Sequence, residues 1–134
     1  MYAIDYRVRI ETHKITCEDY VPTIGACAAY TDGNAYIVGG RASGGTTLNT
    51  IFQFNVGSRT MSRFLPRVGR LPPLAYASAS AIRGQILVFG GEASDGSLLN
   101  SLFVINLLAQ SVDRVVLDGI PPTPRARHWA GLII

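Results

Sequence analysis

The sequence predicts an all-β fold built from a four-stranded unit that occurs twice. Residues 39–56 (GGRASGGTTLNTIFQFNV) recur 51 positions later as residues 90–107 (GGEASDGSLLNSLFVINL), and nine of the eighteen positions are identical. A fixed period near 50 residues is typical of proteins in which one supersecondary unit is repeated. Short apolar segments separated by polar turns fill the period, and outside one arginine-rich stretch no run of about 10 to 12 residues has a convincing helical pattern.

Each repeat is predicted to contain four short strands. The turn tripeptides Asp32-Gly33-Asn34 and Arg83-Gly84-Gln85 separate the first two strands, which we therefore expect to form hairpins. Polar turns at 57–59 and 109–110 come before the fourth strands. The expected strands are residues 26–30, 35–38, 51–54 and 61–65 in the first repeat, and 77–82, 86–89, 102–105 and 111–116 in the second.

The positions that stay identical between the repeats are mostly Gly, Ala, Asn and Pro, whereas apolar residues replace one another elsewhere. Backbone geometry constrains the first group, so the pattern indicates a duplicated fold unit and not a duplicated catalytic motif. An ordinary β-sandwich with a coincidental duplication is the alternative. The residues to which we assign structural roles are Gly39, Gly40, Gly90, Gly91, Asn49 and Asn100.

These motifs resemble the kelch repeat, a four-stranded blade of a β-propeller. The resemblance rests on the Gly-Gly pairs that end the second strands, and on Leu48-Asn49 and Leu99-Asn100, which open the third. Phe-x-x-Asn at 52–55 and 103–106, and Pro124–His128 at the start of a further unit, support it. The chain departs from the family at Met61 and Val112, where kelch repeats carry Trp, and at Thr50 and Ser101, where they carry an acidic residue.

The resemblance implies kelch repeats at residues 23–73 and 74–124, flanked by the end of a preceding repeat at 1–22 and the start of another at 125–134. Residues 2–5 are expected to form a third strand of the preceding blade, and residues 128–134 a first strand of the following one. Propellers need about four to eight blades. We therefore expect a piece of a larger propeller, a truncated chain, or a partial propeller completed by self-association.

Composition argues against several classes of function. The net charge of +3 is too small to indicate nucleic-acid binding, and no apolar stretch reaches the roughly 18 residues that cross a membrane. Charged residues near the start leave no visible signal peptide. Cys17 and Cys27 are expected to be free thiols, and the cytoplasm is the expected location.

Four arginines lie within twelve residues, at Arg59, Arg63, Arg67 and Arg70. Pro66 and the pair Pro72-Pro73 argue against a basic helix there. The repeat instead places the arginines on the fourth strand and on the connection to the next blade. They are expected to form a solvated blade edge or a patch for an acidic partner.

No sequence motif of a catalytic site is present, so we expect no enzyme, no cofactor and no metal site. His13 and His128 are the histidines, and His128 is expected to make a structural hydrogen bond. Glu92 and Asp95 share a loop, where an ordinary polar loop is favoured over a metal site or a pair of glycosidase carboxylates.

Function is therefore expected to come from the loops. Kelch domains that recognise acidic peptides often carry Arg directly after Gly-Gly, with Ser on nearby loops, and Arg41 and Ser43 match this placement. We expect an adaptor or scaffold that binds a protein partner, such as an acidic peptide segment. The alternative is a fragment of a kelch-fold enzyme, such as a carbohydrate oxidase or sugar epimerase, with its active site on missing blades. The candidate binding residues are Arg41, Ser43, Glu92, Ser94, Asp95, Arg125 and Arg127.

Overall fold

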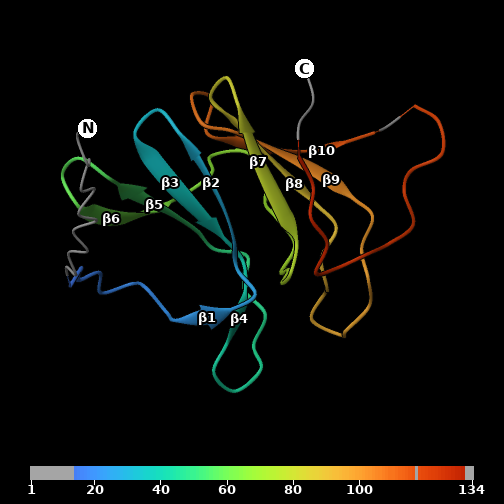
Figure 1. The fold of residues 1–134 in the computed structure, drawn as a ribbon, viewed down its shortest axis with the longest axis horizontal. Coiled ribbons are helices and arrows are strands. Elements are labelled where there is room, and N and C mark those ends of the chain that lie inside the picture. The colour runs from blue at the N-terminus through green and yellow to red at the C-terminus, as the bar shows by residue number, and fades with distance from the viewer. Residues whose placement is uncertain (1–13, 117, 132–134) are drawn as a thin grey trace, which may run out of the picture.

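A computed structural model describes residues 14–116 and 118–131 of the chain, and these form two antiparallel four-stranded sheets (Figure 1). The first sheet has the order β2-β3-β5-β6 and the second the order β7-β8-β9-β10. The strands of the first sheet are β2 (Cys27–Thr31), β3 (Asn34–Val38), β5 (Ile51–Asn55) and β6 (Thr60–Phe64). Those of the second are β7 (Ser78–Ile82), β8 (Gln85–Phe89), β9 (Leu102–Asn106) and β10 (Ser111–Val115).

The all-β prediction is confirmed, and the bounds of all eight predicted strands agree with the structure to within one residue. One feature was not predicted: β1 (Thr23–Ile24) pairs with β4 (Arg41–Ala42) outside the two sheets. Strands this short carry no hydrophobic period, so the sequence pattern could not reveal them. They tie the segment that enters the first repeat to the loop that follows its Gly-Gly pair.

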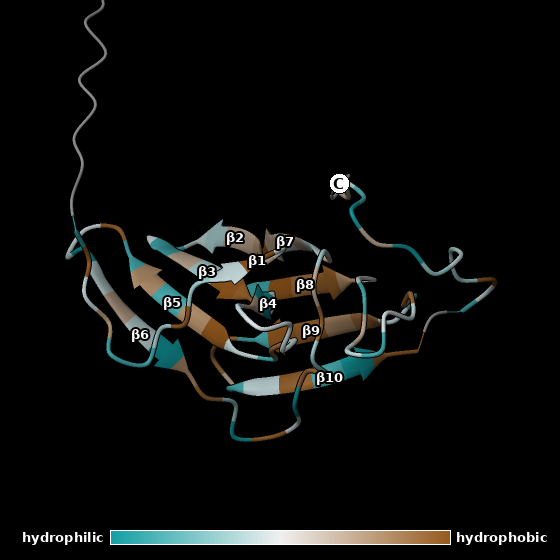
Figure 2. Ribbon diagram, turned by 90° about the horizontal axis from the view of Figure 1, so that it is seen from below, coloured by the Kyte–Doolittle hydropathy of each residue, from teal (hydrophilic) through white to brown (hydrophobic). Residues whose placement is uncertain are grey.

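The two sheets stack face to face, with β2 and β7 side by side along the junction (Figure 1). The antiparallel register aligns Cys27, Val38, Ile51 and Phe64 in one row across the first sheet. These side chains belong to the same buried cluster as Ile86, Val88, Ile105 and Val112 of the second sheet. Apolar segments run along the strands of both sheets (Figure 2). Burial of this shared apolar area is the main source of stability.

The face of the second sheet that points away from the first carries the equivalent row Ser78, Phe89, Leu102 and Val115. Phe89, Leu102 and Val115 are only half-buried, whereas Val38 and Ile51 in the first sheet are at most 2% exposed. Among the described residues no further sheet covers this row. This face therefore has the apolar composition of an interface between blades, but no neighbouring sheet among the described residues buries it.

The two expected flanking strands have different outcomes. Residues 2–5 lie outside the described residues, as do residues 132–134. Residues 128–131 lie next to β7, where the Ser80 hydroxyl is 3.5 Å from the Ala130 carbonyl oxygen, but they do not form a strand. The described residues contain no helix long and apolar enough to cross a membrane.

Candidate functional site: the loop face

The long connections of both repeats lie at one end of the strands, which we call the loop face. It consists of residues 39–50, 65–77, 90–101 and 118–127, and its two Gly-Gly loops, 39–50 and 90–101, extend to the bottom of the molecule in Figure 1. The opposite ends carry only the tight turns within the hairpins. Because loops held by a rigid scaffold are the usual place for binding residues, the loop face is the first candidate for a functional site.

The Gly-Gly pairs shape this face by bringing the linker between the blades close to the loops. The Gly40 amide donates to the Leu74 carbonyl over 2.8 Å, and the Gly91 amide donates to the Arg125 carbonyl over the same distance. Gly39 has a φ of 66°, and a Cβ there would collide with the Leu74 carbonyl oxygen. Glycine is therefore required both by the left-handed backbone and by the close approach of the linker.

Asn49 and Asn100 hold the same linkers from the loop side. The Asn49 amide nitrogen donates to the Leu71 carbonyl over 3.1 Å, and that of Asn100 donates to the Pro122 carbonyl over 3.3 Å. Each asparagine thus ties the opening of the third strand to the chain leaving its own repeat. Asn49 and Asn100 therefore hold the linker in the same way in both repeats.

Two predicted binding residues, Arg41 and Glu92, contact each other across the junction between the repeats. The Arg41 guanidinium lies 3.4 Å from the Glu92 carboxylate, and its Nε donates to the Thr47 hydroxyl over 3.2 Å. These side chains are 28% and 19% exposed. A partner that used either residue would have to compete with this ion pair or bind both charges together.

The tips of the two long loops present small polar groups to solvent. Ser43 and Ser94 are exposed at equivalent positions in the two repeats. The Asp95 carboxylate accepts from the Ser97 hydroxyl over 2.6 Å and from the Ser97 amide over 2.9 Å. These two hydrogen bonds lower the pKa of Asp95, with the hydroxyl as the larger cause. The loop tip is therefore a fixed, negatively charged turn.

Gly25, Tyr76 and Arg127 lie 51 residues apart and form a stack across successive repeats. A Cβ at Gly25 would lie 2.8 Å from the Tyr76 ring, and the Arg127 guanidinium lies 3.6 Å from the centre of that ring. All three residues have a positive φ, and their amides and carbonyls connect one repeat to the next. The Tyr76 ring thus positions Arg127, which remains exposed. Only the alignment at the 51-residue offset could have singled out Tyr76.

Arg125 is turned toward its own linker. Its Nε donates to the Thr123 carbonyl, and a terminal nitrogen donates to the Thr123 hydroxyl, each over 3.0 Å. The residue is exposed, so its remaining donors face solvent. Arg125 and Arg127 both belong to the loop face, while Arg41 is paired with Glu92.

His128 makes the structural hydrogen bond that the sequence predicted. Its Nε2 lies 2.8 Å from the Ser78 hydroxyl, and its ring packs edge-on against Phe89 at 5.5 Å between centroids. Burial lowers the pKa of His128, and the positive charge of Arg125 lowers it further. The imidazole is therefore kept neutral and serves to attach the segment after the second repeat to β7 and β8.

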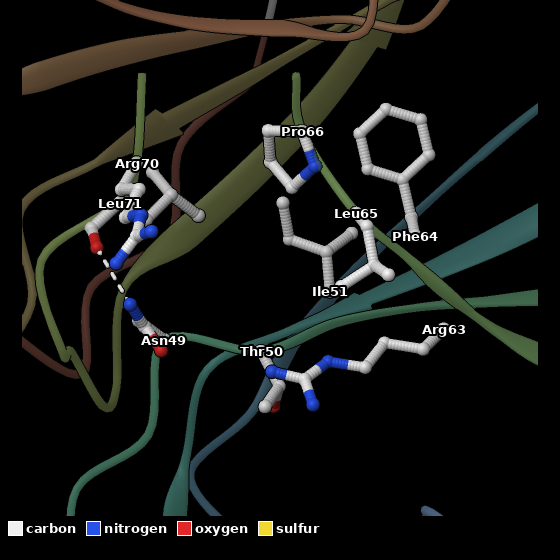
Figure 3. A pocket seen from close by; sticks show the side chains of 9 residues that line it. All are labelled: Asn49, Thr50, Ile51, Arg63, Phe64, Leu65, Pro66, Arg70 and Leu71. Carbon is white, nitrogen blue, oxygen red and sulfur yellow. Dashed lines mark hydrogen bonds between the residues drawn. The ribbon is translucent and has the colours of Figure 1, made fainter. Parts of the chain in front are cut away.

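Each repeat also forms a cavity on the loop face where its third strand begins and its fourth strand ends. The first has a volume of about 280 Å³ and is shown in Figure 3. The second, of about 260 Å³, occupies the equivalent place in the second repeat. The sequence pattern did not predict these cavities, because they depend on how the linker returns across the sheet edge. The first cavity is lined by Asn49, Thr50, Ile51, Arg63, Phe64, Leu65, Pro66, Arg70 and Leu71.

The described residues contain no group of three or more His, Cys, Asp or Glu side chains that could hold a metal ion. Both cysteines are free thiols. Cys27 is buried, and burial raises its pKa to about 11, so it is a poor nucleophile near neutral pH. The chemistry that the loop face offers is recognition by charged and polar side chains.

The repeated strands, the Gly-Gly loops and the stacked blades agree with the comparison to known families. The model of the KLHDC2/KLHL20/DRC7 kelch-repeats domain matches residues 7–133. This chain belongs to the kelch-repeat family. Kelch domains are in general interaction modules that bind protein partners. The resemblance inferred from the Gly-Gly and Leu-Asn motifs is therefore confirmed at the level of the family.

Two proteins of Arabidopsis thaliana are similar to this kelch chain. Acyl-CoA-binding domain-containing protein 4 is 28% identical over 133 residues, which is 92% of this chain and 20% of that protein. Acyl-CoA-binding domain-containing protein 5 is 32% identical over 63 residues, or 46% of this chain and 10% of that protein. The chain thus spans a fifth or less of the curated relatives it matches.

Proposed function

We propose that this kelch chain contributes to an adaptor or scaffold by presenting its loop face to a partner protein. The observation that supports this most directly is the placement of all long connections at one end of the stacked blades. The loops are held by repeated backbone hydrogen bonds to the linkers, so the loop backbone is pre-positioned. Such pre-positioning reduces the entropy lost on binding.

The charges on this face favour a partner segment that carries acidic residues. Arg127 is held over Tyr76 with its guanidinium exposed, and Arg125 has donors left for a ligand. An arginine guanidinium pairs well with a carboxylate because two parallel N–H groups meet its two oxygens. Arg41 is a weaker candidate, since Glu92 already accepts from it.

A selection of peptides from a displayed random library, with the protein as bait, tests this function. We expect enriched peptides to be acidic and to lose affinity when Arg127 is replaced by Asn. The matched control is Arg83→Asn, at an exposed arginine on the opposite end of the blades that also has a positive φ. Asn tolerates this backbone conformation, so both substitutions remove one charge with little strain. Equal loss in both variants, or no loss in either, would reject Arg127 as a contact of the acidic partner.

We further propose that additional blades, from the same polypeptide or from a second copy, complete the ring. The half-buried row of Phe89, Leu102 and Val115 supports this, because the equivalent row of the first blade is buried by the second. Light scattering coupled to gel filtration tests self-association. A discrete dimer of the 14.4 kDa chain would support completion by a second copy. A stable monomer would contradict completion by a second copy.

A further inference from the structure

We propose that the cavity of the first repeat binds a carboxylate side chain of a partner protein between Arg63 and Arg70. This inference rests on the proposed interaction function and assigns a second, separate contact site on the loop face. It starts from charge: two guanidinium groups line a cavity that contains no acidic side chain. Among the described residues, neither Arg63 nor Arg70 has a hydrogen-bond or ion-pair partner for its side chain.

The backbone that carries Arg70 is fixed on both sides. Before it, the Arg67 amide donates to the Gln110 carbonyl over 2.7 Å, and Val68 forms a bridge with Ser111 of the next blade. After it, Leu71 is buried and its carbonyl accepts from Asn49 (Figure 3). The linker is therefore clamped at the cavity, so the backbone at Arg70 is already ordered and only its exposed side chain has to be ordered when a ligand binds.

The cavity stays open when neighbouring blades are present. The first cavity exists with the second blade stacked beside it, and the second cavity exists with the first blade stacked beside it. Each is lined only by its own repeat and the linker that follows. Further blades on either side would therefore leave such a cavity accessible.

The side chains around the arginines favour a peptide over a lone anion. Most of the exposed lining is polar, and Leu65, an apolar side chain that is 64% exposed, is among the lining residues. Thr50 and Asn49 add polar groups beside the arginines (Figure 3). The volume of about 280 Å³ is at the lower end of ligand-binding pockets, enough for one or two side chains. A carboxylate flanked by an apolar residue fits this combination.

The second repeat provides an internal comparison. Its cavity keeps one arginine, Arg114, at the position equivalent to Arg63, but Pro121 replaces Arg70. A carboxylate held by two arginines gains charge-assisted hydrogen bonds from both. The first cavity is therefore expected to bind a carboxylate, and the second is expected to bind it much more weakly.

The test is an NMR titration of the protein with a blocked peptide, acetyl-Gly-Leu-Glu-Leu-Gly-amide, and with its Gln counterpart. We expect the Glu peptide to shift the Nε–H signals of Arg63 and Arg70 and the methyl signals of Leu65 in a saturable way. The Gln peptide and the Arg70→Gln variant should each bind about tenfold more weakly, because a hydrogen bond to a charged group is lost. The matched control Arg114→Gln should bind as the unsubstituted protein does.

Three results would overturn this assignment. They are equal affinity for the Glu and Gln peptides, equal weakening by Arg70→Gln and Arg114→Gln, and tighter binding of inorganic phosphate than of the Glu peptide at the same arginines. Failure of this cavity can also be distinguished from failure of the proposed function. A selected peptide that depends on Arg127 and not on Arg70 would reject this cavity and keep the loop face.

Discussion

Arg41 and Glu92 occupy the same position in successive kelch repeats and form an ion pair with each other, at 3.4 Å between nitrogen and oxygen. The reversal of charge between otherwise similar loops is thus explained by their contact across the blade junction. In the sequence, each residue is a separate binding candidate on its own loop. In the structure, the two side chains largely satisfy each other and connect the loops.

A double-mutant cycle on Arg41→Ala and Glu92→Ala measures this connection. Because both side chains are partly exposed, we expect a coupling of about 0.5 to 1 kcal/mol in the free energy of unfolding by urea. The coupling should decrease in high salt, which screens the pair. Strictly additive effects of the two substitutions would show that the ion pair contributes nothing to the junction.

Gly39→Ala should destabilise the protein much more than Gly44→Ala. Both glycines have a positive φ, so both substitutions strain the backbone, but a Cβ at Gly44 meets nothing within 4 Å. At Gly39 the added atom collides with the Leu74 carbonyl, and we expect an additional loss of about 1 to 3 kcal/mol. Thermal unfolding of the two variants measures the difference. Equal losses would mean that the linker moves away at little cost.

Cys27 should resist alkylation in the folded protein, whereas Cys17, which is only half-buried, should react. The thiol of Cys27 is protonated at neutral pH because burial raises its pKa from 9.0 to about 11. Mass spectrometry after iodoacetamide treatment distinguishes the two sites. Rapid modification of Cys27 under native conditions would contradict its burial.

The thiol of Cys27 also makes the stability of the fold depend on pH in the alkaline range. Because the pKa of Cys27 is higher in the folded state, its contribution is complete below pH 9 and is lost as the pH rises toward 11. Between pH 8 and pH 10 we expect a loss of about 1 kcal/mol that Cys27→Ala does not show. Tyr36, whose pKa is also raised by burial, remains in both proteins and cancels in the comparison. Parallel pH curves for the protein and the variant would contradict this.

His128 should make the protein less stable in mild acid. Its pKa is lowered in the folded state, so the stabilising contribution is present above pH 6.5 and is lost as the pH falls. Unfolding midpoints at pH 7.5 and pH 5.5 should therefore differ more for the protein than for His128→Asn. That comparison cancels His13, which lies outside the described residues. An equal pH dependence would show that the Ser78 contact does not require a neutral ring.

The repeat allowed the fold to be predicted from the sequence, whereas the details of the site depend on contacts between repeats. Strand bounds followed from the alternation of apolar runs with Asp-Gly and Arg-Gly turns, which are local signals. The Arg41–Glu92 pair, the stacking of Arg127 on Tyr76 and the cavity at Arg70 each join segments that are distant in sequence. Local patterns do not specify such contacts, although the 51-residue offset places both Arg41–Glu92 and Tyr76–Arg127 at equivalent positions.

The most direct test of the loop face as the binding surface is amide hydrogen exchange of the protein, with and without a peptide enriched in the selection. We predict slower exchange in residues 39–50 and 90–101 and in the linkers that pack against them, where the ligand would sit. Exchange in the hairpin turns at the opposite end, around Gly33 and Gly84, should not change. Protection at those turns with unchanged exchange in the long loops would contradict the proposed binding surface.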